Sequence, residues 1–253
     1  MVMSLPAVAP LLIGAVGGSG TRVLARILSN AGFFPGSRRN EAEDSEPVMD
    51  FYNRWMRPYL VHGGVLPAQE AKEARRQFEV AIEEHRRGIA SPSTPWLVKV
   101  PRTLLMLPYW HDVFPEARFI HMIRNGLDMS YSGDTNQLRM FGDLMLTAGE
   151  QSLPQPMRAM AYWRTANLRA AELGKSLFPD RYHPLRFEDL CQHPETTLAT
   201  LARFLQHPLA GMEITPPPTI GRWRTQPADE IKTLIALGHP ALDQFGYSPA
   251  SPS

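Results

Sequence analysis

Residues 11–31 read LLIGAVGGSGTRVLARILSNA, an apolar strand that runs through a glycine-rich turn into a helix. A turn of this kind directs several backbone N–H groups, and the positive end of the helix, at one spot. Glycines let the backbone approach an anion closely, while Ser, Thr and Arg side chains add donors. The stretch therefore predicts a site for a phosphate or sulfate group, with a simple tight connection as the alternative. The turn consists of Gly17, Gly18, Ser19, Gly20, Thr21 and Arg22.

This turn differs from the loop that binds nucleoside triphosphates. That loop requires a Lys-Ser or Lys-Thr pair after its last glycine. Here Thr21 and Arg22 follow Gly20, and the turn contains no lysine. The pattern therefore speaks against a triphosphate-dependent kinase.

A second basic element lies further along the chain. Residues 119–123 read as a buried strand, Arg124 follows it directly, and Ser132 comes eight residues after the arginine. An arginine at the C-terminal end of a strand lies where open α/β sheets bind ligands. We expect Arg124 and Ser132 to reach a common group. The alternative is an arginine that caps the strand exit and a serine that belongs to an ordinary helix.

These elements resemble the nucleotide-binding motifs of the sulfotransferases that use 3′-phosphoadenosine-5′-phosphosulfate as donor. Residues 17–22 resemble the 5′-phosphosulfate loop of that family, and residues 118–132 resemble its 3′-phosphate motif. Three further segments follow in the order of the family. They are WLVKVPR at 96–102, PLRFEDL at 184–190 and GRWR at 221–224.

The resemblance implies a role for several residues. Backbone N–H groups of residues 17–22 would hold the 5′-phosphate, with help from Arg22. Arg124 and Ser132 would hold the 3′-phosphate, and Arg224 would close over it. A guanidinium suits a phosphate because it donates two parallel hydrogen bonds. No metal is implied.

Two residues of the segment at 96–102 are expected at the reacting centre. Lys99 would steady the charge that builds on the bridging oxygen as the leaving group departs; its alternative role is that of a solvated lysine at a strand end. Arg102 would contact the acceptor substrate, or cap the next helix.

The proton acceptor is the part that the resemblance leaves open. Cytosolic members of the family have a lysine at the position of Gly18 and a histidine base near residues 101–102, and this sequence has neither. The turn is more similar to bacterial and carbohydrate-type members, in which the base is often a glutamate soon after the first helix. That likeness points to Glu41, Asp44 or Glu46. Because Asp44 and Glu46 precede an apolar run, we expect one of them to turn inward at a helix start and act as the base.

Three histidines are rivals for the role of base. They are His62, His111 and His121. His121 lies inside an apolar strand, which favours a core histidine with satisfied hydrogen bonds.

Strands and helices alternate along the chain. This alternation predicts an α/β domain over residues 1–253, P-loop-like, with three layers and a mainly parallel sheet flanked by helices. The proline-containing end, about residues 247–253, is expected to be a flexible tail. Strands are expected at 11–16, 96–100, 118–123 and 182–186, and helices at 21–31, 68–87, 103–112, 157–177 and 194–205.

Composition narrows the function classes. The 253 residues carry a net charge of +1, so no global field favours nucleic acid or a membrane. Cys191 is the one cysteine, and no Cys/His cluster has metal-ligand spacing. No stretch reaches membrane-spanning length, and we expect a cytoplasmic protein without a structural metal.

The sequence thus predicts an enzyme that transfers a sulfuryl group from 3′-phosphoadenosine-5′-phosphosulfate to a hydroxyl or amine of a small-molecule or carbohydrate acceptor. The alternatives are a nucleotide-binding module without catalysis and a kinase-like phosphotransferase. The acceptor and the oligomeric state are not readable from the sequence, since acceptor loops vary most.

Overall fold

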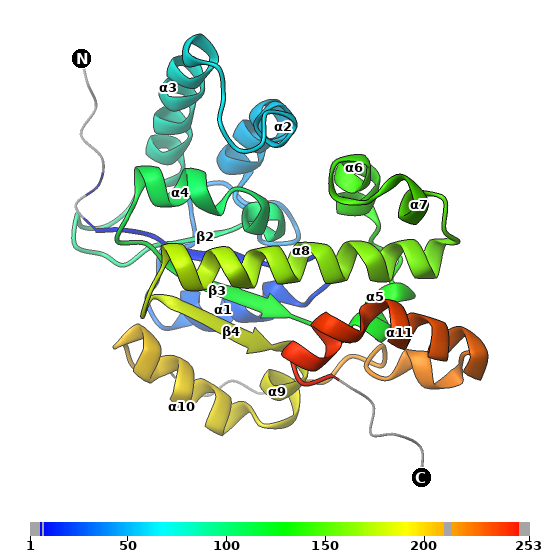
Figure 1. The fold of residues 1–253 in the computed structure, drawn as a ribbon. Coiled ribbons are helices and arrows are strands. Elements are labelled where there is room, and N and C mark those ends of the chain that lie inside the picture. Colours follow the sequence, from blue (N-terminus) through cyan, green and yellow to red (C-terminus); the bar gives the residue numbers. More distant parts are fainter. Residues whose placement is uncertain (1–5, 7, 210–213, 248–253) are drawn as a thin grey trace.

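The computed structural model describes residues 6, 8–209 and 214–247. Four parallel strands form one sheet in the order β2-β1-β3-β4 (Figure 1). Their bounds are Leu11–Gly14 for β1, Leu97–Lys99 for β2, Arg118–Ile123 for β3 and Tyr182–Arg186 for β4. The mainly parallel sheet flanked by helices that the sequence predicts is therefore confirmed.

Helices cover both faces of this sheet (Figure 1). They are α1 (Thr21–Asn30), α2 (Glu46–Val61), α3 (Ala68–His85), α4 (Leu107–Val113), α5 (Gly126–Ser130), α6 (Asn136–Met145), α7 (Ala148–Gln151), α8 (Gln155–Leu177), α9 (Phe187–Gln192), α10 (Pro194–Leu205) and α11 (Ala228–Gln244). Two 3₁₀ turns, η1 (Pro101–Leu105) and η2 (Arg222–Thr225), complete the described elements.

Side-chain alternation along the strands builds two separate cores. Leu11 and Ile13 face the layer of α1, α9 and α10, whereas Leu12 faces the layer that contains α2, α3, α4 and α8. Successive residues of a strand point to opposite faces, so an apolar strand covered on both sides needs no polar positions. This explains why β1 is apolar at every position before its glycine.

Several elements differ from the sequence prediction. The expected helix at 103–112 is split into η1 and α4, because Pro108 cannot donate a helical hydrogen bond and occupies the first turn of α4. At the start of the expected tail, Tyr247 is buried, and its hydroxyl donates to the Glu188 carboxylate at 2.6 Å. Residues 248–253 lie outside the described part.

Two buried histidines lock loops and strands together. The His85 ring donates from Nε2 to the Leu97 carbonyl at 2.9 Å and accepts at Nδ1 from the Ser45 hydroxyl at 2.8 Å. His121 in β3 lies between Asn167 and the Tyr182 hydroxyl, so its predicted identity as a satisfied core histidine is confirmed. Burial lowers the pKa of each ring to about 4.

These depressed pKa values predict acid instability. Both histidines are neutral in the folded protein, and in the unfolded chain each takes up a proton below its ordinary pKa of about 6.5. Stability present at pH 7 should therefore be lost as the pH falls from about 6.5 to about 4. Each histidine should contribute a slope of about 1.4 kcal/mol per pH unit.

Urea unfolding between pH 7 and pH 4 measures this slope. His121→Gln removes one of the two titrating rings, so its acid slope should be shallower than that of the wild type by about one proton. Identical slopes in the two proteins would contradict the assignment.

Candidate functional site

The glycine-rich turn supplies free backbone donors at the end of β1. Gly18 and Gly20 have φ angles of 83° and 84°, and Gly20 is the N-cap of α1. Within the described chain, no hydrogen bond occupies the N–H groups of Gly18, Ser19 and Gly20. The Ser19 hydroxyl donates to the Val16 carbonyl at 2.7 Å, so it shapes the turn and is not itself a free donor. Arg22 is exposed in the first turn of α1.

The Phe187 ring packs against this turn at Gly20. A Cβ on Gly20 would overlap the Phe187 ring, so the turn requires glycine there both for its φ and for this close approach. The guanidinium of Arg124 lies over the same ring, 5.1 Å from its centroid. The segment PLRFEDL therefore contacts both of the anion-binding elements that the sequence predicts.

Arg124 follows β3 directly and is buried, with 5% of its surface exposed. It donates to the Gly18 carbonyl at 3.2 Å and to the Thr219 hydroxyl at 2.7 Å. Its Nε is buried and has no hydrogen-bond partner within the described chain. Burial lowers its pKa, and the neighbouring charge of Arg222 lowers it further. A cation in this setting favours an anionic ligand.

Ser132 lies beside Gly18 of the glycine turn. Its Oγ is 3.1 Å from the point where a Cβ on Gly18 would stand. The structure thus brings together the glycine turn, Arg124 and Ser132, although Gly18 and Arg124 are 106 residues apart in the sequence.

The late segment that contains GRWR contributes a residue that sequence reasoning missed. Arg222 donates to the Tyr131 carbonyl at 3.0 Å and to the Thr219 carbonyl at 3.1 Å, close enough to Arg124 for the two charges to interact. Arg224, which the sequence prediction selects, is exposed and stacks on Trp223 at 4.9 Å. The two arginines lie on either side of one tryptophan, so only the packed structure distinguishes them.

Lys99 and Asp44 form a buried ion pair beside the turn. Lys99 is 3% exposed, and its Nζ donates to Asp44 Oδ1 at 2.6 Å and to the Ala42 carbonyl at 2.7 Å. Burial lowers the pKa of Lys99, while the charge of Asp44 opposes that shift and the charge of Arg22 adds to it. Lys99 is therefore not a solvated lysine at a strand end. It lies close enough to Asp44 and Arg22 for both charges to act on it.

The other acidic candidates lie at the surface. Glu46 is the first residue of α2, but its side chain is 41% exposed and pairs with Arg38 at 3.2 Å. Glu41 is exposed as well. Of the three predicted acids, only Asp44 contacts Lys99.

His85 holds the residue next to Asp44 in place, and this role was not predicted from the sequence. Its bond to the Ser45 hydroxyl holds the residue after Asp44, and the Ser45 N–H donates to the Lys99 carbonyl at 3.0 Å. A signal existed in the sequence, because His85 continues the helical spacing of Phe78 and Ile82.

Arg102 lies in η1 and is 8% exposed. It donates to Asn53 Oδ1 at 2.6 Å and to the Met49 carbonyl at 3.2 Å, both on α2. Arg102 therefore contacts α2 instead of capping the helix that follows it. Burial lowers the pKa of Arg102, and the charge of Asp44 opposes that shift.

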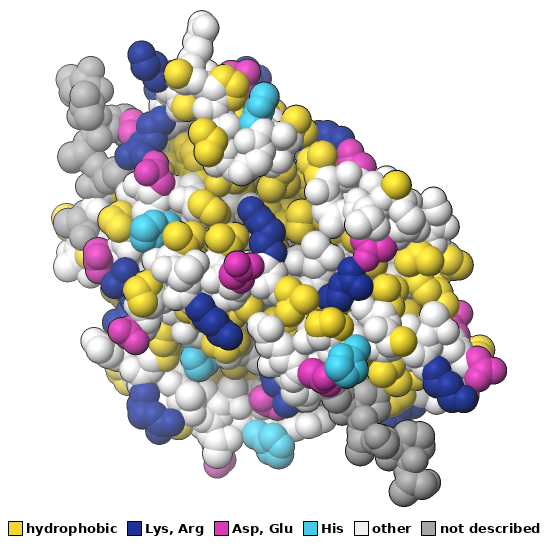
Figure 2. All heavy atoms as spheres, viewed as in Figure 1, with side chains coloured by type: hydrophobic (Ala, Val, Ile, Leu, Met, Phe, Trp, Pro, Cys, Tyr) yellow, Lys and Arg dark blue, Asp and Glu magenta, His cyan; other side chains and the backbone are white. Residues whose placement is uncertain are grey.

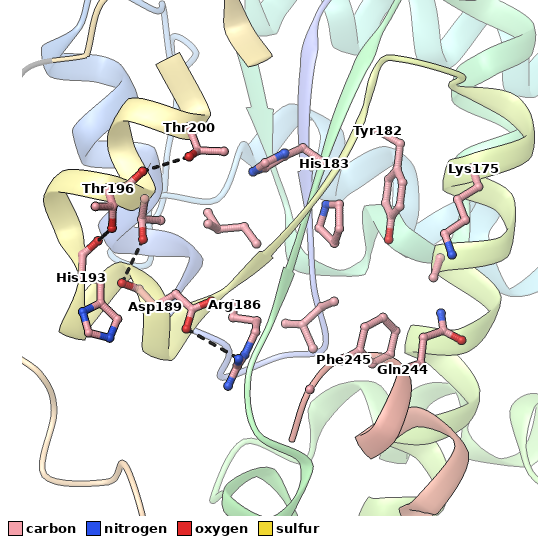
Figure 3. Close-up of a pocket in the computed structure, with 16 residues that line it drawn as sticks. Lys175, Tyr182, His183, Arg186, Asp189, His193, Thr196, Thr200, Gln244 and Phe245 are labelled. Carbon is pink, nitrogen blue, oxygen red and sulfur yellow. Dashed lines mark hydrogen bonds and ion pairs between the residues drawn. The ribbon is translucent and has the colours of Figure 1, made fainter. Parts of the chain in front are cut away.

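A separate cavity of about 590 Å³ lies along the free edge of β4 (Figure 3). It is lined by β4, α8, α10 and the end of α11, and none of the predicted site residues borders it. Figure 3 shows the Arg186–Asp189 ion pair at its margin. Pro184 stands at mid-strand here, as expected for an edge strand because proline has no N–H to donate.

Charge on the viewed face is mixed, with basic and acidic side chains interspersed among apolar ones (Figure 2). Among the described residues, no group of three or more His, Cys, Asp or Glu is placed to hold a metal ion. The same part of the chain contains no helix with the length and apolar character needed to span a bilayer.

Comparison with known proteins identifies the family of the chain. The model of the sulfotransferase family matches residues 10–211. Protein-tyrosine sulfotransferase 1 of Danio rerio is 33% identical over 110 residues, which are 44% of this chain and 28% of that protein.

Solved structures share the fold at low identity. The sulfotransferase domain of the Synechococcus PCC 7002 olefin synthase superimposes with a TM-score of 0.60 at 16% identity, over 98% of each chain. Sulfotransferase STF9 from Mycobacterium avium gives 0.54 at 14% identity, over 95% of this chain and 78% of its own. Because the family match covers most of its length, the chain belongs to the sulfotransferase family.

Proposed function

We propose that this protein transfers a sulfuryl group from 3′-phosphoadenosine-5′-phosphosulfate to a hydroxyl or amine of a small-molecule or carbohydrate acceptor. The observation that carries the proposal is the hydrogen bond from Arg124 to the Gly18 carbonyl, because it joins two anion-binding elements into one site. A donor that carries a phosphosulfate at the 5′ position and a phosphate at the 3′ position of one ribose would use both elements. We also propose that the protein works in the cytoplasm, since its one cysteine is a free thiol, the form that a reducing compartment maintains.

The residues of the site fit the donor. The unoccupied N–H groups of residues 18–20 would hold the 5′-phosphate at the start of α1. The unpartnered Nε of Arg124, with Ser132, Arg222 and Arg224, would hold the 3′-phosphate. Charge-assisted bonds from arginine to phosphate are about twice as strong as neutral ones.

The ion pair would act at the reacting centre. The donor supplies the sulfuryl group, which becomes bonded to the acceptor oxygen or nitrogen while its bond to the bridging phosphate oxygen breaks. Lys99 would stabilise the negative charge left on that oxygen, and the Asp44 carboxylate would take the acceptor proton. Charge stabilisation and positioning carry most of the work in the related phosphoryl transfers.

Arg102 is proposed to contact the acceptor. Its guanidinium is buried beside Asp44 and crosses to α2, where Asn53 and Met49 hold it. The zebrafish relative acts, by its name, on protein tyrosine. We infer only that the acceptor presents its nucleophile between Asp44 and the donor.

The first of three predictions for this site concerns the nucleotide. Adenosine 3′,5′-bisphosphate should raise the unfolding temperature, whereas ATP should have little effect, and Arg124→Ala should weaken bisphosphate binding by about 2 kcal/mol, roughly 30-fold, through loss of a charge-assisted contact. Thermal shift and titration calorimetry measure the two effects.

Arg203→Ala is the matched control, because Arg203 is exposed on α10 and contacts only Thr200 among the described hydrogen bonds. Stabilisation by ATP alone would overturn the proposed donor, and equal affinities in wild type and Arg124→Ala would overturn the role of Arg124.

The second prediction separates the two acids. Asp44→Asn should lose most turnover, by about 10²-fold or more as expected for a general base, while Glu46→Gln should stay close to wild type. Both variants should bind the bisphosphate normally. If Glu46→Gln is the impaired variant, the base has been assigned to the wrong side chain.

The third prediction is a pH dependence. Because burial lowers the pKa of Lys99, the ammonium should lose its proton at a lower pH than an exposed lysine, and turnover should fall on the alkaline side accordingly. Lys99→Ala should keep bisphosphate affinity but lose turnover. Lys99→Arg keeps its charge at every accessible pH, so its residual activity should show no such alkaline decline. The same decline in Lys99→Arg would mean that another group titrates.

A further inference from the structure

Asp128 is a buried carboxylate that the proposed chemistry leaves unused. It belongs to α5, the short helix that follows Arg124, and only 1% of its surface is exposed. A buried carboxylate is costly unless hydrogen bonds satisfy it. Its partners therefore show what it holds.

Both carboxylate oxygens bind the late segment, far away in the sequence. The Gly221 N–H donates to Oδ2 at 2.8 Å, and the Trp223 N–H donates to Oδ1 at 3.4 Å. These two N–H groups open the 3₁₀ turn η2, where a negative charge is favoured. They also flank Arg222, so the carboxylate fixes the backbone on both sides of that arginine.

The charge of Asp128 also acts on Arg124. Arg222 lies close enough to Arg124 for the two positive charges to repel, while the charge of Asp128 acts on Arg124 in the opposite sense. This repulsion opposes the packing of the late segment beside Arg124. Asp128 offsets part of that repulsion and keeps Arg222 beside Arg124.

We propose that Asp128 is a positioning residue that clamps the segment 219–223 over the 3′-phosphate and so makes the site selective for a 3′-phosphorylated nucleotide. The inference rests on the proposed function. It adds that selectivity for the 3′-phosphate depends on a carboxylate that never touches the ligand, acting through Arg222.

The test compares two ligands that differ only in the 3′-phosphate. Adenosine 3′,5′-bisphosphate and adenosine 5′-phosphate are titrated into wild type and Asp128→Asn by calorimetry. The asparagine keeps the volume of the side chain but turns an NH₂ group toward one of the two N–H donors. Bisphosphate affinity should fall roughly tenfold or more, while monophosphate affinity should be unchanged. An equal loss for both ligands, or for neither, would overturn the proposal.

A second variant covers the case in which Asp128→Asn does not fold. Gly221 has a φ of 80°, a conformation that residues with a Cβ rarely adopt, so Gly221→Ala strains the clamped segment without altering α5. It should show the same selective loss, and unchanged selectivity in this variant would count against the clamp. Asp229→Asn, at an exposed aspartate that pairs with Lys232, is the matched control and should behave as wild type.

The outcomes also separate this inference from the proposed function. Wild-type protein that binds neither nucleotide would remove the proposed donor site itself. Wild-type protein that prefers the bisphosphate, with an Asp128→Asn variant of equal preference, would leave the donor site standing and remove only the role of Asp128.

Discussion

The parallel pairing of β1 with β3, in which Gly14 lies opposite His121, brings the C-terminal ends of both strands to one edge of the sheet. The glycine turn leaves the first strand there, and Arg124 leaves the second. Parallel β2 adds Lys99 to the same edge, opposite Ile13. One sheet register therefore sets the distances between the glycine turn, the Arg124 guanidinium and the Lys99 ammonium, at the edge of the sheet where open α/β sheets bind ligands.

Keeping Arg124 at that edge requires support from elements that arrive later in the chain. The Glu188 carboxylate accepts the Asn125 N–H at 3.0 Å and the Tyr247 hydroxyl at 2.6 Å, so it fixes the turn just after the arginine. Phe187 fills the space between Arg124 and Gly20. A cation held in a dry, packed site is poised for an anion because little reorganisation remains when the ligand arrives.

The sequence alone was sufficient for the parts of the site that follow strands. One apolar run leads into the turn at 17–22, and another leads into Arg124. Both positions could be predicted because each strand fixes where the chain leaves the sheet. Lys99 was predictable for the same reason. In contrast, the charged stretch at 38–46 has no periodicity, and only the contact of Asp44 with Lys99, across 55 residues, separates that acid from Glu46.

Residues that act through tertiary contacts were out of reach for a more general reason. Asp128 reads as an ordinary helical aspartate until Gly221 and Trp223 are seen against it, and the choice between Arg222 and Arg224 depends on which of them turns toward Tyr131. Such couplings join segments some 90 residues apart. The strands place Arg124 and Lys99, whereas the late segment, held by the Asp128 carboxylate, places Arg222 beside Arg124. On the proposed function, affinity for an anion and selectivity for a particular nucleotide would therefore arise from different parts of the same chain.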